Sequence, residues 1–242
     1  MRWIEKPDQE YLLLKEFREE ASAASETFRY GNFRKEPDVV QVLANEQQGL
    51  CAYTMRSLQG PAGLVNAHVE HIVPQSQCES EGTPERALDY LNLMACYRAP
   101  NHGCKCPFGA EKKADTKIII QENFISPLQP DCESRFSYEF DGKVTALTDD
   151  TAAQETIRIL NLNEAEPKSG LPGELARLRR ATIESFGLSP LAEEPLTLEN
   201  LEVLKANLTK EAASPPEYVI ALRQCLDRFR NYLLPPDTQP QP

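Results

Sequence analysis

The chain has 242 residues, of which 40% are hydrophobic and 26% charged, and its formal net charge is −11. This is enough for one large domain or two small ones, and the composition is typical of a soluble globular protein. No apolar run approaches the roughly 20 residues of a membrane helix, and the first residues lack the apolar core of an export signal. We therefore expect a cytoplasmic protein with no membrane partner. The acidic balance argues against a basic protein that binds nucleic acid freely on its own.

The cysteines point to the same compartment. The chain holds seven of them, an odd number, and several lie close to histidines in the sequence. This pattern favours free thiols or metal ligands in a reducing cytosol over a disulfide framework.

Residues 1 to 50 are predicted to be helical. An apolar stripe over residues 12–17 lies among Glu and Lys, which is typical of a helix that buries one face. Gly31 predicts a break, Pro37 can open a second helix, and Gly49 can end it. No residue here suggests chemistry, so we expect a packing or docking surface.

The segment 65–73 alternates and is rich in β-branched residues, so it predicts a strand. A period of two places His68 and Glu70 on one face and His71 on the other. Pro74 ends the strand, which leaves the His71 side chain at its exit, where the backbone can turn.

The next elements are less regular. Residues 75–86 are polar and contain Gly82 and Pro84, so we predict a loop. Residues 89–97 are compatible with a returning strand or an irregular turn around Asn92. Residues 110–114 are good helix formers.

A basic segment stands out from the acidic chain. Between Arg98 and Lys117 five bases face only two carboxylates. Lys112 and Lys113 are our candidates for contacts with a nucleic-acid phosphate, the alternative being that both merely face solvent. One basic segment in an acidic chain suits a site that acts inside a larger complex.

The C-terminal half predicts a hairpin followed by helices. Residues 136–147 alternate around Asp141-Gly142, a strong two-residue turn signal. Thr151 and Gln154 have the spacing of a capping box for the next helix. Apolar periodicity predicts three further helices, over 175–182, 201–208 and 216–233. The proline-rich residues 235–242 are predicted to be a disordered tail.

Seven short motifs then follow one another along the chain. They are Met1-Arg2, Cys51-Ala-Tyr, His68-x-Glu-His-Ile, Tyr90-x-Asn-Leu, Gly109-Ala-x-Lys-Lys, Ser126-Pro-Leu and Ile157 to Asn163. In this order they resemble the HNH endonucleases, most strongly the HNH subunit of Septu-type anti-phage systems, which is also found beside some retrons. Each motif alone is degenerate, and the ordered set is more specific.

The resemblance implies an α+β fold that is mainly helical. A small ββα-metal core over residues 51–125 would be flanked by an N-terminal helical segment, 1–50. A C-terminal region of hairpin and helices, 126–234, and the tail 235–242 would complete the chain.

The resemblance also implies roles for three residues. His71 aligns with the family's general base, and a histidine suits that task because it is largely neutral at cytosolic pH. Glu70 aligns with the acidic ligand of a divalent metal, and its hard oxygen suits Mg²⁺ or Mn²⁺. Asn92 aligns with the central asparagine, which braces the loop and orients the histidine.

The remaining metal ligand stays open. The family commonly places a ligand near Gly109 and Ala110, and neither residue can coordinate through its side chain. His102 is the first candidate to replace it. His68 is the second, because it shares a strand face with Glu70.

A structural zinc ion is an alternative use of this region. The Cys51 segment resembles half of a zinc knuckle, although Thr54 stands where the second thiolate would be. The other candidate zinc ligands are Cys96, Cys104 and Cys106, together with His102.

Two functions follow as expectations. The first is a metal-dependent endonuclease, a hydrolase of phosphodiester bonds in DNA, or in RNA such as tRNA, that serves as effector of an anti-phage defence complex. The resemblance implies an ATPase partner subunit and, in retron-associated members, a reverse transcriptase with its RNA and DNA. The second is a catalytically inactive, zinc-stabilised interaction subunit that docks on the ATPase.

Overall fold

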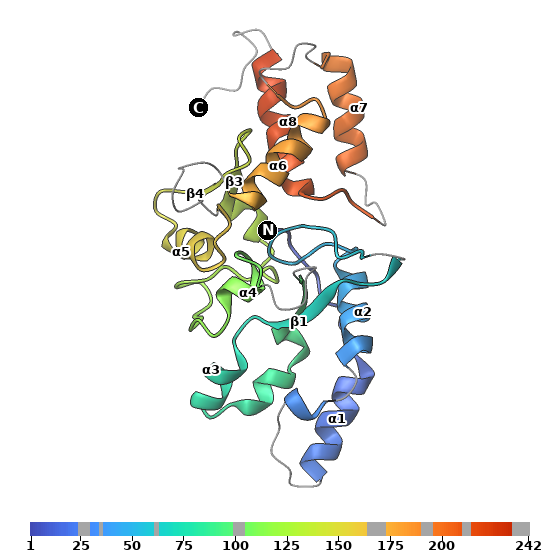
Figure 1. Cartoon of the computed structure of the whole chain (residues 1–242), viewed down its shortest axis with the longest axis vertical. Helices are drawn as coiled ribbons and strands as arrows, with labels where there is room; N and C mark the ends of the chain where they lie inside the picture. The colour runs from blue at the N-terminus through green and yellow to red at the C-terminus, as the bar shows by residue number, and fades with distance from the viewer. Residues whose placement is uncertain are drawn as a thin grey trace.

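The computed structural model describes residues 1–23, 30–33, 36–60, 63–98, 105–163, 173–189, 196–209 and 214–233. These residues form an α+β fold of helices and two separate two-stranded antiparallel sheets. In Figure 1 the molecule is elongated, with α6, α7 and α8 at one end and α1 and α3 at the other. The first sheet and the short helix α4 lie between the two ends.

The N-terminal region has the predicted helices. Helix α1 (Leu12–Ala23) and helix α2 (Glu36–Glu46) lie on either side of the 3-10 turn η1 (Tyr30–Asn32), at the predicted break. Beyond α2, Gly49 has a φ of 75°, a left-handed conformation that glycine adopts without strain.

The first sheet has the predicted hairpin partners. Strand β1 (Ala67–His71) pairs antiparallel with β2 (Leu93–Tyr97), so that Glu70 faces Met94 and His71 faces Leu93. A 3-10 turn, η4 (Tyr90–Asn92), leads into β2, and α4 (Ala110–Lys113) follows it in the chain.

The predicted loop over residues 75–86 is wrong. The segment forms helix α3 (Gln75–Ser80), and the 3-10 helix η3 (Pro84–Leu88) follows. The Gln77 side chain donates to the Ile118 carbonyl at 2.9 Å and accepts from the Ile118 amide at 2.8 Å. Gln77 therefore anchors this helix to the segment around Ile118, while the remaining polar residues of the helix are exposed.

The second sheet and the C-terminal helices also match the prediction. Strands β3 (Phe136–Tyr138) and β4 (Val144–Ala146) form the hairpin, and Gly142 in its turn has a φ of 82°. The turn η5 (Cys132–Arg135) precedes them, and four helices follow: α5 (Thr151–Ile159), α6 (Glu174–Ser185), α7 (Leu198–Thr209) and α8 (Val219–Leu233).

The start of α5 differs in detail from the expected capping box. The Asp150 side chain, not that of Thr151, accepts the Ala153 amide at 2.9 Å and caps the helix. Asp150 also pairs with Arg135 of η5, and this tertiary contact favours Asp150 over Thr151 as the residue that caps the helix.

One apolar core runs through the described residues of all three predicted regions, from Met1 to Phe229. The first residues are extended and bound to the segment that precedes the second sheet. The Ile4 amide donates to the Pro127 carbonyl at 2.9 Å, and the Trp3 amide donates to Glu133 at 2.9 Å. Figure 1 accordingly shows the N-terminus near the middle of the molecule. No helix among the described residues is long and apolar enough to cross a bilayer. The predicted disordered tail, 235–242, lies outside the described residues.

Candidate active site

The candidate site lies at the exit of β1, where Glu70 and His71 are both buried. Asn92, one residue before β2, holds the chain that leaves the strand. Its side-chain oxygen accepts the Val73 amide at 2.8 Å, and its nitrogen donates to the carbonyls of Val73 at 3.0 Å and Arg86 at 3.2 Å. One buried amide therefore ties the exit of β1 to η3.

The His71 ring has defined partners at both nitrogens. Nε2 lies 3.0 Å from the Ala87 carbonyl of η3, and Nδ1 lies 3.4 Å from the Gln75 side-chain nitrogen. A carbonyl can only accept, so Nε2 carries the proton and Nδ1 keeps its lone pair. Because Gln75 is exposed, Nδ1 lies on the side of the ring nearer to solvent.

Burial sets the protonation state of His71. It lowers the pKa of His71 to about 4; the Ala87 carbonyl opposes this shift and the Lys113 ammonium adds to it. The imidazole is therefore neutral near pH 7, the form that can accept a proton.

Glu70 is held by Lys113 of α4. The Lys113 ammonium lies 2.8 Å from a Glu70 carboxylate oxygen and 2.9 Å from the His71 carbonyl, and the lysine side chain is 1% exposed. The Tyr53 hydroxyl donates to the same carboxylate oxygen at 3.3 Å. Burial raises the pKa of Glu70 above its ordinary value, while Lys113 and Tyr53 work against that shift.

The two candidate lysines therefore differ in environment. Lys112 is exposed and free to meet a phosphate, whereas Lys113 is buried on Glu70 and anchors α4 to the end of β1. The substrate contact of Lys112 stays a prediction, whereas the geometry assigns Lys113 to the Glu70 carboxylate.

The metal donors are incomplete among the described residues. His68 shares the strand face of Glu70, as its spacing predicts, and burial lowers its pKa, which favours the neutral, ligating form. No group of three or more His, Cys, Asp or Glu side chains gathers in the part of the chain that the structure describes. His102, the other predicted ligand, lies outside it.

His68 and Glu70 nevertheless fit a divalent cation in kind. Mg²⁺ is commonly held by one or two carboxylates, with water and substrate phosphate completing its shell. Such a cation would share the Glu70 carboxylate with the Lys113 ammonium, which already contacts it.

The candidate zinc ligands are brought together in part. Cys51 and Cys96 are buried, and the Cys51 sulfur accepts the Tyr97 amide at 3.3 Å. Burial alone would raise the pKa of Cys51, but hydrogen bonds from Cys96, Thr54 and Tyr97 lower it to about 6. Cys106 is also buried, with a pKa that burial raises to about 12. Cys104 lies outside the described residues.

Three residues of the site are not among the predicted site residues, although Tyr53 belongs to the Cys51-Ala-Tyr motif. Tyr53 and Gln75 contact Glu70 and His71, and the Tyr30 ring packs against His71. Tyr53 and Gln75 stand near motifs that the sequence already marked, so proximity could have suggested them. Tyr30 lies in a segment assigned to packing, and no spacing rule links it to His71.

Comparison of the sequence with protein-family models and with curated proteins finds no match. Support for a function therefore comes from the arrangement of these side chains.

Proposed function

We propose that this protein is an HNH-type endonuclease that hydrolyses phosphodiester bonds of nucleic acid, with His71 as general base and Glu70 as a ligand of a divalent cation. One observation carries the proposal: the imidazole at the exit of a β-hairpin has its Nε2 fixed on the Ala87 carbonyl, and its Nδ1 lone pair faces only the Gln75 side-chain nitrogen at 3.4 Å, a long contact that a reacting water would replace. A carboxylate stands at the preceding residue, and a short basic helix follows the hairpin.

The residues of the chain divide the reaction among them. His71 Nδ1 takes a proton from water, the water oxygen bonds to phosphorus, and the P–O3′ bond breaks, leaving the electron pair on the 3′ oxygen. Asn92 keeps η3, and with it the Ala87 carbonyl, in place behind the ring. Lys112 is positioned on the surface to attract the phosphate backbone.

Glu70 and His68 would hold the cation, with His102 as the predicted third ligand. When bound, a divalent cation supplies charge stabilisation for the phosphoryl oxygens and the leaving oxygen. As effector of a defence complex, the protein would act beside an ATPase partner, which also accounts for nuclease function in so acidic a chain.

Cleavage by the purified protein with its co-purified partner tests this proposal. Plasmid, phage DNA and total tRNA are offered side by side, with Mg²⁺ or Mn²⁺ and with chelator. We expect cleavage that chelator abolishes and that His71→Ala lowers by at least about 1,000-fold, since the general base and the nucleophilic water are lost together. The control variant Gln41→Ala, on the exposed side of α2, should cut like the wild type. A folded His71→Ala that cuts at the wild-type rate would remove His71 from the mechanism.

A second function is favoured by the same ion pair that complicates metal binding. Because the Lys113 ammonium already neutralises Glu70, the chain could be a zinc-stabilised interaction subunit without catalysis. One tightly bound zinc ion that Glu70→Ala does not displace, together with no cleavage of any substrate, would support this alternative over the nuclease.

A further inference from the structure

The Tyr30 ring packs perpendicular to the His71 ring. Their centroids are 4.5 Å apart and their planes meet at 90°, an edge-to-face contact at van der Waals distance. Both residues are 7% exposed. Tyr30 belongs to η1, so this contact connects the N-terminal segment with the exit of β1, 41 positions later in the chain.

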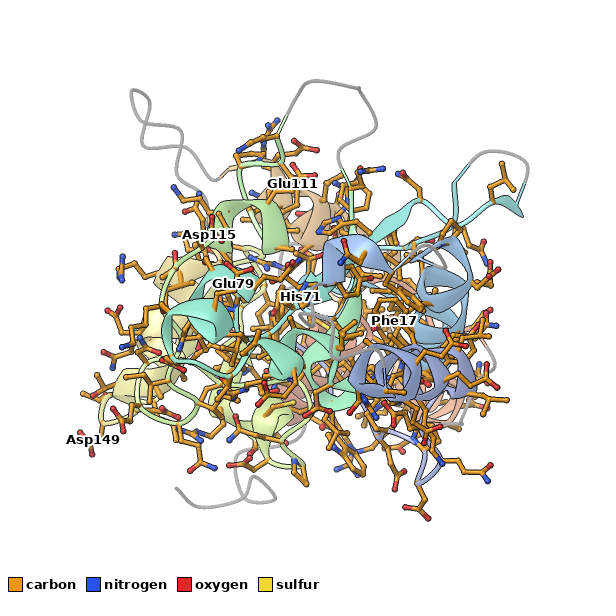
Figure 2. The ribbon with its side chains drawn as sticks, turned by 90° about the horizontal axis from the view of Figure 1, so that it is seen from below. Phe17, His71, Glu79, Glu111, Asp115 and Asp149 are labelled. Carbon is orange, nitrogen blue, oxygen red and sulfur yellow. The ribbon has the colours of Figure 1, made fainter. Side chains whose placement is uncertain are left out.

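Further aromatic contacts hold Tyr30 in place. The Tyr30 ring lies 6.0 Å from Phe33, and Phe33 lies 5.3 Å from Phe17 of α1, centroid to centroid. Figure 2 shows His71 near the centre of the view, with Phe17 on α1 to one side of it. The row Phe17–Phe33–Tyr30 therefore packs η1 against α1, and the Tyr30 ring contacts His71 from the end of this row.

The hydrogen bonds of His71 do not fix its ring by themselves. The Ala87 carbonyl holds Nε2 at 3.0 Å, but the contact of Nδ1 with the exposed Gln75 is long, at 3.4 Å, so rotation about the Cβ–Cγ bond could turn Nδ1 away from its place. An edge-to-face aromatic contact restricts this rotation further. It also closes one side of the ring to water, which would otherwise compete for the Ala87 carbonyl.

We propose that Tyr30 is a positioning residue for His71: its ring keeps the imidazole on the Ala87 carbonyl, with Nδ1 directed to the reacting water. This inference rests on the proposed function for its catalytic consequence, and on the ring geometry alone for its structural one. The N-terminal segment then belongs to the catalytic apparatus, in addition to any docking surface that it offers.

Two measurements on the full chain test the structural and the catalytic consequence separately. Long-range ¹H–¹⁵N correlation spectra of the histidine side chains report which ring nitrogen carries the proton, and the chain has only three histidines. His71→Gln assigns the signal. Steady-state kinetics with the partner complex and Mg²⁺ then give kcat and KM.

Tyr30→Leu removes the ring, Tyr30→Phe keeps it, and Phe33→Leu is the matched control, since it removes a buried ring of the same row that lies one contact further from His71. We expect Tyr30→Leu to lose the single Nε2-protonated form of His71 and to lower kcat about 10- to 100-fold with little change in KM, because a misplaced base slows the chemical step. Tyr30→Phe should keep both properties, and Phe33→Leu, which loosens only the support of Tyr30, should lose clearly less of each than Tyr30→Leu does.

Other outcomes overturn the inference. A wild-type spectrum and kcat in Tyr30→Leu would show that the ring does not position His71. So would an equal loss in Tyr30→Phe, or an equal loss in Phe33→Leu, which would indicate general disruption of the segment. If the wild type cuts nothing, the proposed function fails, yet the spectra still decide whether Tyr30 holds the imidazole.

Discussion

The two halves of the molecule bury a cation in different ways. Lys113, in the half that carries the first sheet, contacts the Glu70 carboxylate and the carbonyl of His71. Arg179, in the half that carries the second sheet, is equally buried, but it donates to the backbone carbonyls of Gly142 and Leu162, each at 2.6 Å. The first cation lies among ionisable side chains, whereas the second joins a hairpin turn to a helix.

The distribution of other buried polar groups follows the same division. Among the described residues, the buried polar and charged side chains up to the first sheet and its helices are Gln47, Thr54, Glu70, His71, Gln77, Asn92, Lys113 and Ser126. Beyond them, only Thr156 and Arg179 join the set. Burying polar groups is costly unless they are paired, and perturbed ionisable groups gather at functional sites. The comparison teaches that a buried cation marks a candidate site where it pairs directly with a buried carboxylate, and not where backbone carbonyls satisfy it.

The largest expected effect tests the structural half of this comparison. A Cβ on Gly142 would lie 2.0 Å from the Ala176 carbonyl oxygen, at a φ of +82°. Gly142→Ala should therefore lower the free energy of unfolding by about 4 kcal/mol, because backbone must move in addition to the left-handed strain. Gly82 is the matched control: its φ is +73°, but nothing lies within 4 Å of a Cβ there. Gly82→Ala should cost about 1 kcal/mol in urea unfolding. Equal losses of stability in the two variants would show that the turn at Gly142 is not tightly packed against the helix that carries Arg179.

The next effect tests the ionic half. Lys113→Met leaves the Glu70 carboxylate buried without its partner, so near pH 8 we expect a loss of about 3 kcal/mol in the free energy of unfolding. The neighbouring Lys112→Met should change it by less than about 0.5 kcal/mol, because that side chain is exposed. Glu70→Gln combined with Lys113→Met should recover most of the loss, as expected for two groups that act as one pair. Additive losses in the double variant would contradict the pairing.

The same residues explain what could be predicted from the sequence. The hairpin around Asp141-Gly142 and the α8 helix come from local signals, turn chemistry and apolar period, and both are found. Period two correctly placed His68 and Glu70 on one face of β1. The bracing role of Asn92 was implied by the resemblance alone, whereas its hydrogen bonds to Val73 and Arg86 are seen only in the structure.

The rest depends on tertiary contact. Lys112 and Lys113 are identical and adjacent, and only the rotation of a one-turn helix decides which of them is buried. Tyr30 meets His71 across 41 residues of chain, a separation at which no periodicity operates. The sequence does not reveal helix α3 because most of its polar residues are exposed, and the one that anchors it, Gln77, bonds to the backbone of Ile118.

The smallest effect isolates His71 by its pH dependence. Its pKa is lowered from 6.5 to about 4 by burial, so the folded state binds its proton less tightly than the unfolded state does. The corresponding stability is complete above pH 6.5 and is lost as the pH falls from about 6.5 toward 4. At pH 5 the loss should be about 2 kcal/mol relative to neutral pH.

Urea unfolding of the wild type and of His71→Gln across this pH range measures the loss, since carboxylate contributions are common to both proteins. His71→Gln should lose about 2 kcal/mol less on acidification than the wild type. Parallel curves would mean that the imidazole is exposed to solvent in the folded protein, which would contradict both its fixed hydrogen bond to Ala87 and the shielding by Tyr30.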